Sequence, residues 1–216
     1  MTRFALLLAV LSAPAFAQGA LFERGVAGPS PHLCVVSERV RIQIDHQYAS
    51  TVLEQEFENL TEERLEGRYV LRTAGAGVEG FAYWNGEEKI VGEVFEKQAA
   101  RNLYENVAGL RRDPGLLEQT GEGSFAFRVF PIEPRERKRI EIRFGQRLAR
   151  VGNLLQYRLT LVGGQSDVVA DIHDPHPIAR VDSSSHPLSV ERIDPRDHVA
   201  LSTEDRPRGR DPGVRS

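Results

Sequence analysis

Through most of this chain an apolar residue stands at every second position, a spacing that fits strands and not helices. In the first such stretch Val40, Ile42 and Ile44 share one face, which His46 and Tyr48 extend. Further stretches occur around residues 125–129, 140–144 and 155–161. Because side chains alternate between the two faces of a strand, each stretch predicts a strand with one buried side. Many short strands separated by turns indicate a mainly β fold, an antiparallel β-sandwich.

A hairpin is predicted where Asn85 and Gly86 separate two apolar runs, residues 81–84 and 89–94. Asn-Gly favours a type I′ turn, because both central residues of that turn need a positive φ. The two runs are therefore expected to pair antiparallel.

Directly after this hairpin the spacing changes from two residues to four. The apolar residues of this stretch are Phe95, Ala99, Leu103 and Val107. Such spacing places them on one face of a helix, so one amphipathic helix is expected from Phe95 to Val107. We expect its apolar face to cover an open end or edge of the sandwich.

The N-terminus has the pattern of an export signal. Arg3 precedes an apolar run from Phe4 to Leu11, and Ala15 and Ala17 form a small-x-small cleavage pattern. Residues 1–17 are therefore predicted to be a signal peptide, too short to span a bilayer. The mature protein is expected to be periplasmic or secreted, on the assumption of a bacterial source, with no integral membrane segment.

Charge indicates which classes of partner to expect, and cysteine content indicates what stabilises the fold. The formal net charge of −3 gives no reason to expect nucleic acid as a partner. Cys34 is the single cysteine, so an exported fold of this sequence depends on its core and not on internal disulfides. We expect Cys34 to be a half-buried, inert thiol.

Three blocks resemble the VIT (vault protein inter-alpha-trypsin) domain family in order and spacing. They are "FENLTEERLEGRYVL", "VEGFAYWNGEEKIVGEVFEKQAARNLYENV" and "LLEQTGEGSFAFRVFPIEPRERKRIEIRF". The residues that carry the resemblance are Phe57, Asn59, Leu65, Glu66, Tyr69, Gly80, Phe81, Gly92, Glu93, Glu96, Lys97, Ala100, Tyr104, Leu116, Leu117, Glu118, Phe125, Phe127 and Pro134. The resemblance implies a β-sandwich with a helix after the hairpin.

The resemblance also implies a domain organisation. Residues 18–35 are interpreted as a leader or linker, 36–163 as the VIT-type sandwich, and 164–203 as strands that connect toward a further domain. Members of this family usually continue into a von Willebrand factor A domain, as exported bacterial VIT–A-domain proteins do. Here Pro212 and Gly213 interrupt the expected strand. We interpret residues 204–216 as a disordered tail, and the chain as a truncated relative that lacks the A domain.

Two stretches contain residue types that bind metals. One includes Asp182, Ser184 and His186, where an A-domain metal site would need a second serine in place of the histidine. The other contains Asp171, His173, Asp174 and His176, with Pro175 and Pro177 between and after them. The prolines predict a loop without fixed ligand geometry, so a solvated turn is the favoured interpretation of the second stretch.

The remaining polar candidates have ordinary structural explanations. His46 lies in the apolar phase of a strand and is interpreted as a buried or edge histidine. A basic run is interleaved with acidic residues and is interpreted as a solvated strand entrance. Its members are Arg135, Arg137, Lys138, Arg139 and Arg143, with Glu133, Glu136 and Glu141. No residue is assigned a catalytic, cofactor-binding or metal-binding role.

The sequence therefore predicts a non-enzymatic protein-interaction or scaffold module that needs no cofactor. Its protein partner and oligomeric state are not specified. Two alternatives stay open: a metal-dependent site in the loop Asp171–His176, and a non-functional fragment of a longer VIT–A-domain protein.

Overall fold

The computed structural model describes residues 4–11, 19–26, 28, 30–73, 76–95, 116–121, 123–162, 165–183, 187–194 and 198–203. The elements in this part of the chain are all strands. They are β1 (Phe4–Leu11), β2 (Gly19–Glu23), β3 (Leu33–Asp45), β4 (Tyr48–Asn59), β5 (Leu65–Arg72), β6 (Gly77–Asn85), β7 (Glu88–Phe95), β8 (Leu116–Gly121), β9 (Ser124–Ile132), β10 (Arg137–Arg147), β11 (Ala149–Val151), β12 (Leu154–Thr160), β13 (Gln165–His173), β14 (Ile178–Ser183), β15 (Leu188–Asp194) and β16 (His198–Thr203). The prediction of a mainly β protein is confirmed.

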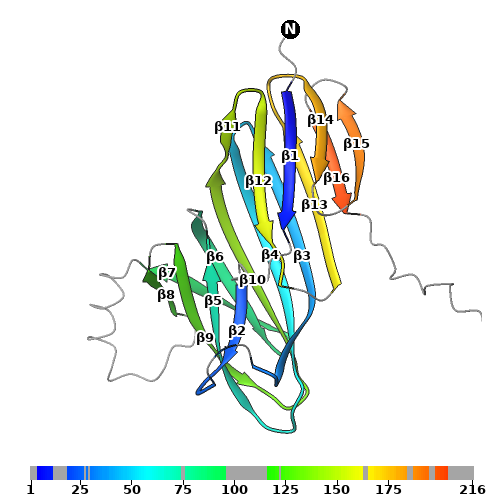
Figure 1. Cartoon of the computed structure of the whole chain (residues 1–216). Helices are drawn as coiled ribbons and strands as arrows, with labels where there is room; N and C mark the ends of the chain where they lie inside the picture. Colours follow the sequence, from blue (N-terminus) through cyan, green and yellow to red (C-terminus); the bar gives the residue numbers. More distant parts are fainter. Residues whose placement is uncertain are drawn as a thin grey trace, which may run out of the picture.

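These strands form two sheets. The larger has twelve strands in the order β15-β16-β13-β3-β4-β10-β6-β7-β8-β9-β5-β2, and the smaller has four in the order β11-β12-β1-β14 (Figure 1). Most neighbours are antiparallel, as predicted. The exceptions are β13 beside β3, β8 beside β7, and β1 beside both β12 and β14, which are parallel pairs.

The smaller sheet packs against one face of the strands β4, β3 and β13 (Figure 1). The alternating residues Val40, Ile42 and Ile44 of β3 are buried on this face, as the sequence predicts. A buried hydrogen bond also joins the two layers: the hydroxyl groups of Thr51 in β4 and Tyr157 in β12 lie 2.8 Å apart. This half of the molecule is therefore a two-layer sandwich.

In the other half the large sheet folds back, so that β5 and β9 face β4 and β6. Four aromatic side chains surround Phe127 of β9 or contact its neighbours. Phe127 lies 4.4 Å from Phe81, 5.0 Å from Tyr69 and 6.3 Å from Tyr83 between ring centroids, and Phe57 packs edge-on against Tyr69. All five side chains are buried. An aromatic core therefore holds this second half together.

The predicted hairpin is confirmed, with its turn one residue later than expected. Phe81 pairs with Gly92, and Asn85 pairs with Glu88, so the turn consists of Gly86 and Glu87. Gly86 has φ 62°, whereas Asn85 belongs to strand β6. One positive φ at the first central position fits a type II′ turn, so the expected type I′ assignment is wrong.

The amphipathic helix expected from Phe95 to Val107 is not seen among the described residues. Phe95 is the last residue of β7, where it pairs with Glu118 of β8. Residues 96–107, on which the helix was predicted, lie outside the described residues. A membrane-crossing helix is also absent from the part of the chain that the structure describes.

The interpretation of His46 and Tyr48 as members of the first strand's apolar face is wrong. Strand β3 ends at Asp45, and the chain turns through His46 and Gln47 before β4 begins with Tyr48. His46 has φ 57°, and both His46 and Tyr48 are exposed. The spacing continues past Ile44 only by coincidence. The buried positions of β4 begin at Ala49, so the turn shifts the buried face by one residue and leaves Tyr48 on the exposed face.

The N-terminal segments contribute strands to both sheets. Gly19–Glu23, part of the segment interpreted as a leader or linker, forms β2 and pairs with β5. Leu21 in β2 is buried, which explains why this short segment joins the fold. Phe4–Leu11, the apolar part of the predicted signal peptide, forms β1 in the centre of the smaller sheet. Whether residues 1–17 are removed on export stays a prediction.

Candidate functional site

The outer face of β4, β3, β13, β16 and β15 carries an open hollow of about 570 Å³. This face lies opposite the one that the smaller sheet covers, because the exposed Arg41 and Gln43 alternate with the buried Ile42 and Ile44. The hollow is lined by Arg41, Ile42, Gln43, Ser50, Val52, Val169, Ala170, Asp171, Ser189, Glu191, Ala200 and Ser202. Many of the lining side chains are small or carry a hydroxyl group, so the floor of the hollow lies close to the backbone. Strand β15, whose residues are mostly exposed, forms one border.

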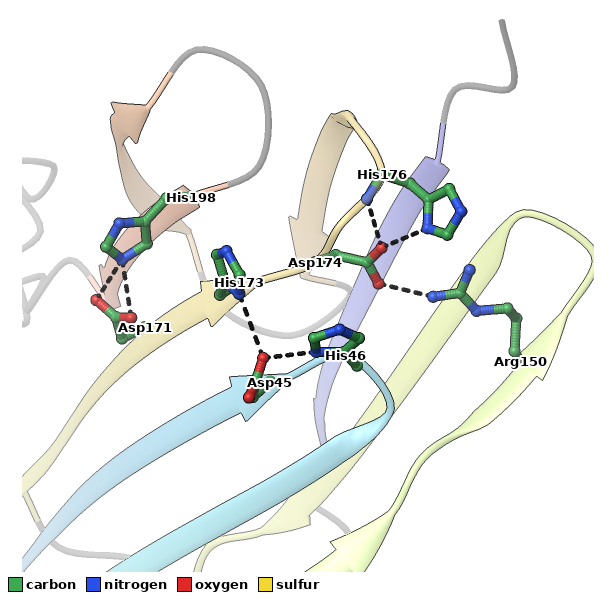
Figure 2. A network of polar contacts seen from close by, with 8 residues as sticks. All are labelled: Asp45, His46, Arg150, Asp171, His173, Asp174, His176 and His198. Carbon is green, nitrogen blue, oxygen red and sulfur yellow. Dashed lines mark hydrogen bonds and ion pairs between the residues drawn. The ribbon is translucent and has the colours of Figure 1, made fainter.

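A group of histidines and aspartates lies where β3 and β13 end and β16 begins (Figure 2). The strand register places them together: His173 of β13 is opposite Asp45 of β3 on one side and opposite His198 of β16 on the other. His46 follows Asp45 in the turn, and its backbone N–H donates to the carbonyl of His173 at 2.9 Å. Neighbouring imidazole rings meet edge to face, with centroids 6.1 Å apart for His46–His173 and 6.3 Å for His173–His198.

Asp45 is the centre of the first contact group. Its Oδ1 lies 2.6 Å from Nδ1 of His46 and 3.2 Å from Nδ1 of His173. One ligand atom from each of these three residues lies within 4.8 Å of the others, and all three residues are exposed. Hydrogen bonds, first from His46 and then from His173, hold the pKa of Asp45 below its usual value. One carboxylate oxygen of Asp45 is therefore in contact with two imidazole rings.

Two further contact groups lie beside it (Figure 2). Nε2 of His198 is 2.9 Å from Oδ1 of Asp171, which also lines the hollow. Asp174 accepts a hydrogen bond of 2.7 Å from Arg150, and its other oxygen accepts from the backbone N–H of His176 and lies 2.9 Å from the His176 ring. The Asp174 side chain is 7% exposed, so this carboxylate ties the β13–β14 loop to β11.

The four residues that the sequence grouped in one loop are thus separated. Asp171 and His173 belong to β13 and contact different partners, and Asp174 and His176 belong to the loop that follows. Asp45 was not among the residues predicted from the sequence, and His46 was predicted only as a buried or edge histidine. The pairing of β3 with β13, more than 120 residues apart, brings them to His173, and nothing local in the sequence signals it.

Among the described residues, the other sequence candidates form no second site. Asp182 in β14 pairs with Arg180 at 2.6 Å, and residues 184–186 lie outside the described residues. Cys34 is a half-buried free thiol in β3, as predicted.

Four of the five members of the basic run contact acidic side chains. Its contacts are Arg135–Glu62, Arg137–Glu58, Lys138–Glu136 and Arg143–Glu141, while Arg139 stacks 3.6 Å from the centre of the Trp84 ring. The interpretation as a solvated entrance needs one correction. The Lys138 side chain is fully buried, and the hydrogen bonds that Glu136 and the side-chain oxygen of Asn85 accept from it offset the cost of removing its charge from water.

Known proteins were compared with this chain by sequence and by structure. No curated protein matches the sequence. Among solved structures, a proposed nutrient binding protein of Legionella pneumophila is 10% identical with a TM-score of 0.48, over 89% of this chain and 69% of that one. An M1 zinc metallopeptidase of Deinococcus radiodurans is 10% identical with a TM-score of 0.39, over 80% of this chain and 39% of that one. Similarities of this size support no inference about function.

A family match is more informative. The sequence matches the vault protein inter-alpha-trypsin domain over residues 35–144 of the 216-residue chain, just over half of it. The matched part runs from β3 to β10 and so includes the three long strands around which both halves are built. The chain belongs to the VIT domain family.

Proposed function

We propose that this protein is an exported, non-enzymatic interaction module that binds a partner protein in the hollow on the outer face of β4, β3, β13, β16 and β15. The observation that carries the proposal is the hollow itself, an open depression of about 570 Å³ on a sheet face that no other part of the described structure covers. Membership of the VIT family agrees with a binding or scaffold role.

The lining of the hollow fits a polypeptide segment. Ser50, Ala200 and Ser202 are small, so a partner backbone can approach the sheet closely. Arg41 and Glu191 supply opposite charges that can orient the partner, and Val52 with Val169 offers apolar contact. The register places Arg41 of β3 between Val52 of β4 and Val169 of β13, so charged and apolar groups lie side by side across the hollow. Protein–protein interfaces commonly contain such a mixture of apolar and polar groups.

Export is the second part of the proposal. Its support is the succession of Arg3, the apolar run and the Ala15–Ala17 cleavage pattern at the N-terminus. The proposed relation to exported VIT–A-domain proteins rests on sequence resemblance in the matched blocks and in the "SSSHPLSV" stretch that follows them.

Site-specific photocrosslinking in the producing cell tests the binding surface. A photoreactive amino acid at Gln43, in the hollow, should give one discrete heavier adduct that mass spectrometry can identify. The matched control is Arg68, an exposed residue of β5 on the other half of the molecule. Adduct from position 43 but not from position 68 supports the proposal. No adduct from 43, or the same adducts from both positions, contradicts it.

A further inference from the structure

Three side chains at one end of the large sheet have the composition of a transition-metal site. Asp45 ends β3, His46 follows it in the turn, and His173 ends the neighbouring β13. Two imidazoles and one carboxylate are ligands that zinc accepts, often with a water molecule as the fourth ligand. Ca²⁺ and Mg²⁺ prefer sets made of oxygen alone, so they fit these residues poorly.

The distances are close to those that a bound ion needs. Tetrahedral zinc with bonds of about 2.0–2.2 Å requires ligand atoms about 3.4 Å apart. Oδ1 of Asp45 lies 2.6 Å and 3.2 Å from the two Nδ1 atoms, and the three ligand atoms all fall within 4.8 Å of one another. Small side-chain rotations bring them into position, because the three residues are exposed.

The backbone fixes the three Cα positions without the metal. The parallel ladder pairs His173 with Asp45, and the N–H of His46 donates to the carbonyl of His173. His46 also adopts φ 57°, a conformation that is uncommon outside glycine and in which asparagine, aspartate and histidine are the most frequent other residues. The turn thus presents the His46 ring beside His173 before any ligand arrives, which lowers the entropy that binding must overcome.

We propose that Asp45, His46 and His173 form a site for one zinc ion, with an open fourth position that water fills. The ion would join the β3–β4 turn to the end of β13, two segments that are distant in sequence. Asp171 and His198 lie next to this site and connect it to the rim of the hollow. The inference is independent of whether a protein binds in the hollow.

Calorimetric titration of the untagged full-length protein with zinc chloride tests the site. We expect one ion per chain and a higher melting temperature with zinc, because a ligand that binds only the folded state stabilises it. His46→Gln and His173→Gln should each weaken zinc binding at least about tenfold, since losing a ligand costs no less than losing its hydrogen-bond partner. Calcium and magnesium chloride should give no binding.

Matched variants separate this site from its surroundings. His198→Gln removes the adjacent imidazole and His32→Gln removes an exposed histidine that contacts Glu23 instead; both should bind zinc as the wild type does. Asp45→Asn, which keeps the side-chain shape, should weaken binding even if a histidine variant folds poorly. The proposal is overturned if zinc does not bind, or if His198→Gln or His32→Gln abolishes binding while His46→Gln does not.

Discussion

At the scale of single residues, a buried polar chain lies at the junction of the two halves. The Gln55 side chain in β4 donates to Glu38 in β3 at 2.7 Å, and its oxygen accepts a hydrogen bond from the hydroxyl of Tyr69 in β5. Glu38 also accepts from the backbone N–H of Val162, which follows β12. Burial, and then the charge of Glu38, raises the pKa of Tyr69, so its hydroxyl remains a donor.

Tyr69→Phe should therefore destabilise the protein by about 1–3 kcal/mol, because it leaves the buried oxygen of Gln55 without its donor. Tyr48→Phe is the matched control: the Tyr48 hydroxyl also donates to a side chain, Glu79, but Tyr48 is 49% exposed and water can replace it. Urea unfolding of both variants measures the difference. Equal midpoints for the two variants would mean that the buried chain adds no stability.

A second residue-scale prediction concerns acid stability. Burial alone would raise the pKa of Glu66, but the hydrogen bond from Arg24 and the charge of Arg128 hold it below its usual value. A carboxyl group whose pKa is lower in the folded state stabilises the protein above its unfolded-state pKa, about 4.3. That stabilisation is lost as the pH falls through the lower folded-state pKa.

Glu66→Gln should accordingly be less stable than the wild type at pH 7 and should lose less stability than the wild type below about pH 4. Urea unfolding at pH 7 and pH 3 gives the comparison. Parallel losses in the two proteins would show that Glu66 has the same pKa folded and unfolded.

At the scale of elements, Gly92 in β7 sets the distance between β7 and the aromatic core. A Cβ atom at this position would lie 1.8 Å from the Phe81 ring. Gly92→Ala should cost about 1–3 kcal/mol through overpacking, and Phe81→Leu in the same chain should recover part of the loss. Gly80→Ala in β6 is the control, because nothing lies within 4 Å of the added atom. A lower melting temperature for Gly80→Ala than for Gly92→Ala would contradict this role of Gly92.

The sequence predicts the positions of the strands better than it predicts which strands pair with one another. Alternation identifies β3, β9, β10 and β12, and Asn85–Gly86 identifies the β6–β7 hairpin, because each signal is local. The parallel pairing of β13 with β3 depends on tertiary packing of distant segments, so the meeting of His173 with Asp45 could not be predicted. The turn at His46 could not be seen in the spacing because His46 and Tyr48 happen to fall at the even positions that are buried in β3, whereas the buried residues of β4 begin at Ala49.

At the scale of the whole molecule, the long strands β3, β4 and β10 belong to both halves. One portion of β4 packs against the smaller sheet through Thr51, and another packs against β5 through Phe57. The two halves are therefore joined by continuous strands and by the buried hydrogen bonds of Glu38, Gln55 and Tyr69.

The N-terminal strand β1 belongs to the segment that export is predicted to remove. β1 lies between β12 and β14, parallel to both, and completes the smaller sheet (Figure 1). If residues 1–17 are cleaved as a signal peptide, β12 and β14 lose the strand between them, and each acquires an unpaired edge that could bind another strand.

Hydrogen exchange measured by mass spectrometry should detect this loss. In a chain that begins at Gln18, amides of β12 and β14 should exchange faster than in the full-length chain, because their hydrogen bonds to β1 are gone. Amides of β5 should exchange equally in both chains, since β5 pairs with β2 and β9 and not with β1. Unchanged exchange in β12 and β14 would mean that the smaller sheet does not depend on β1, and export would then leave the sandwich as stable as before.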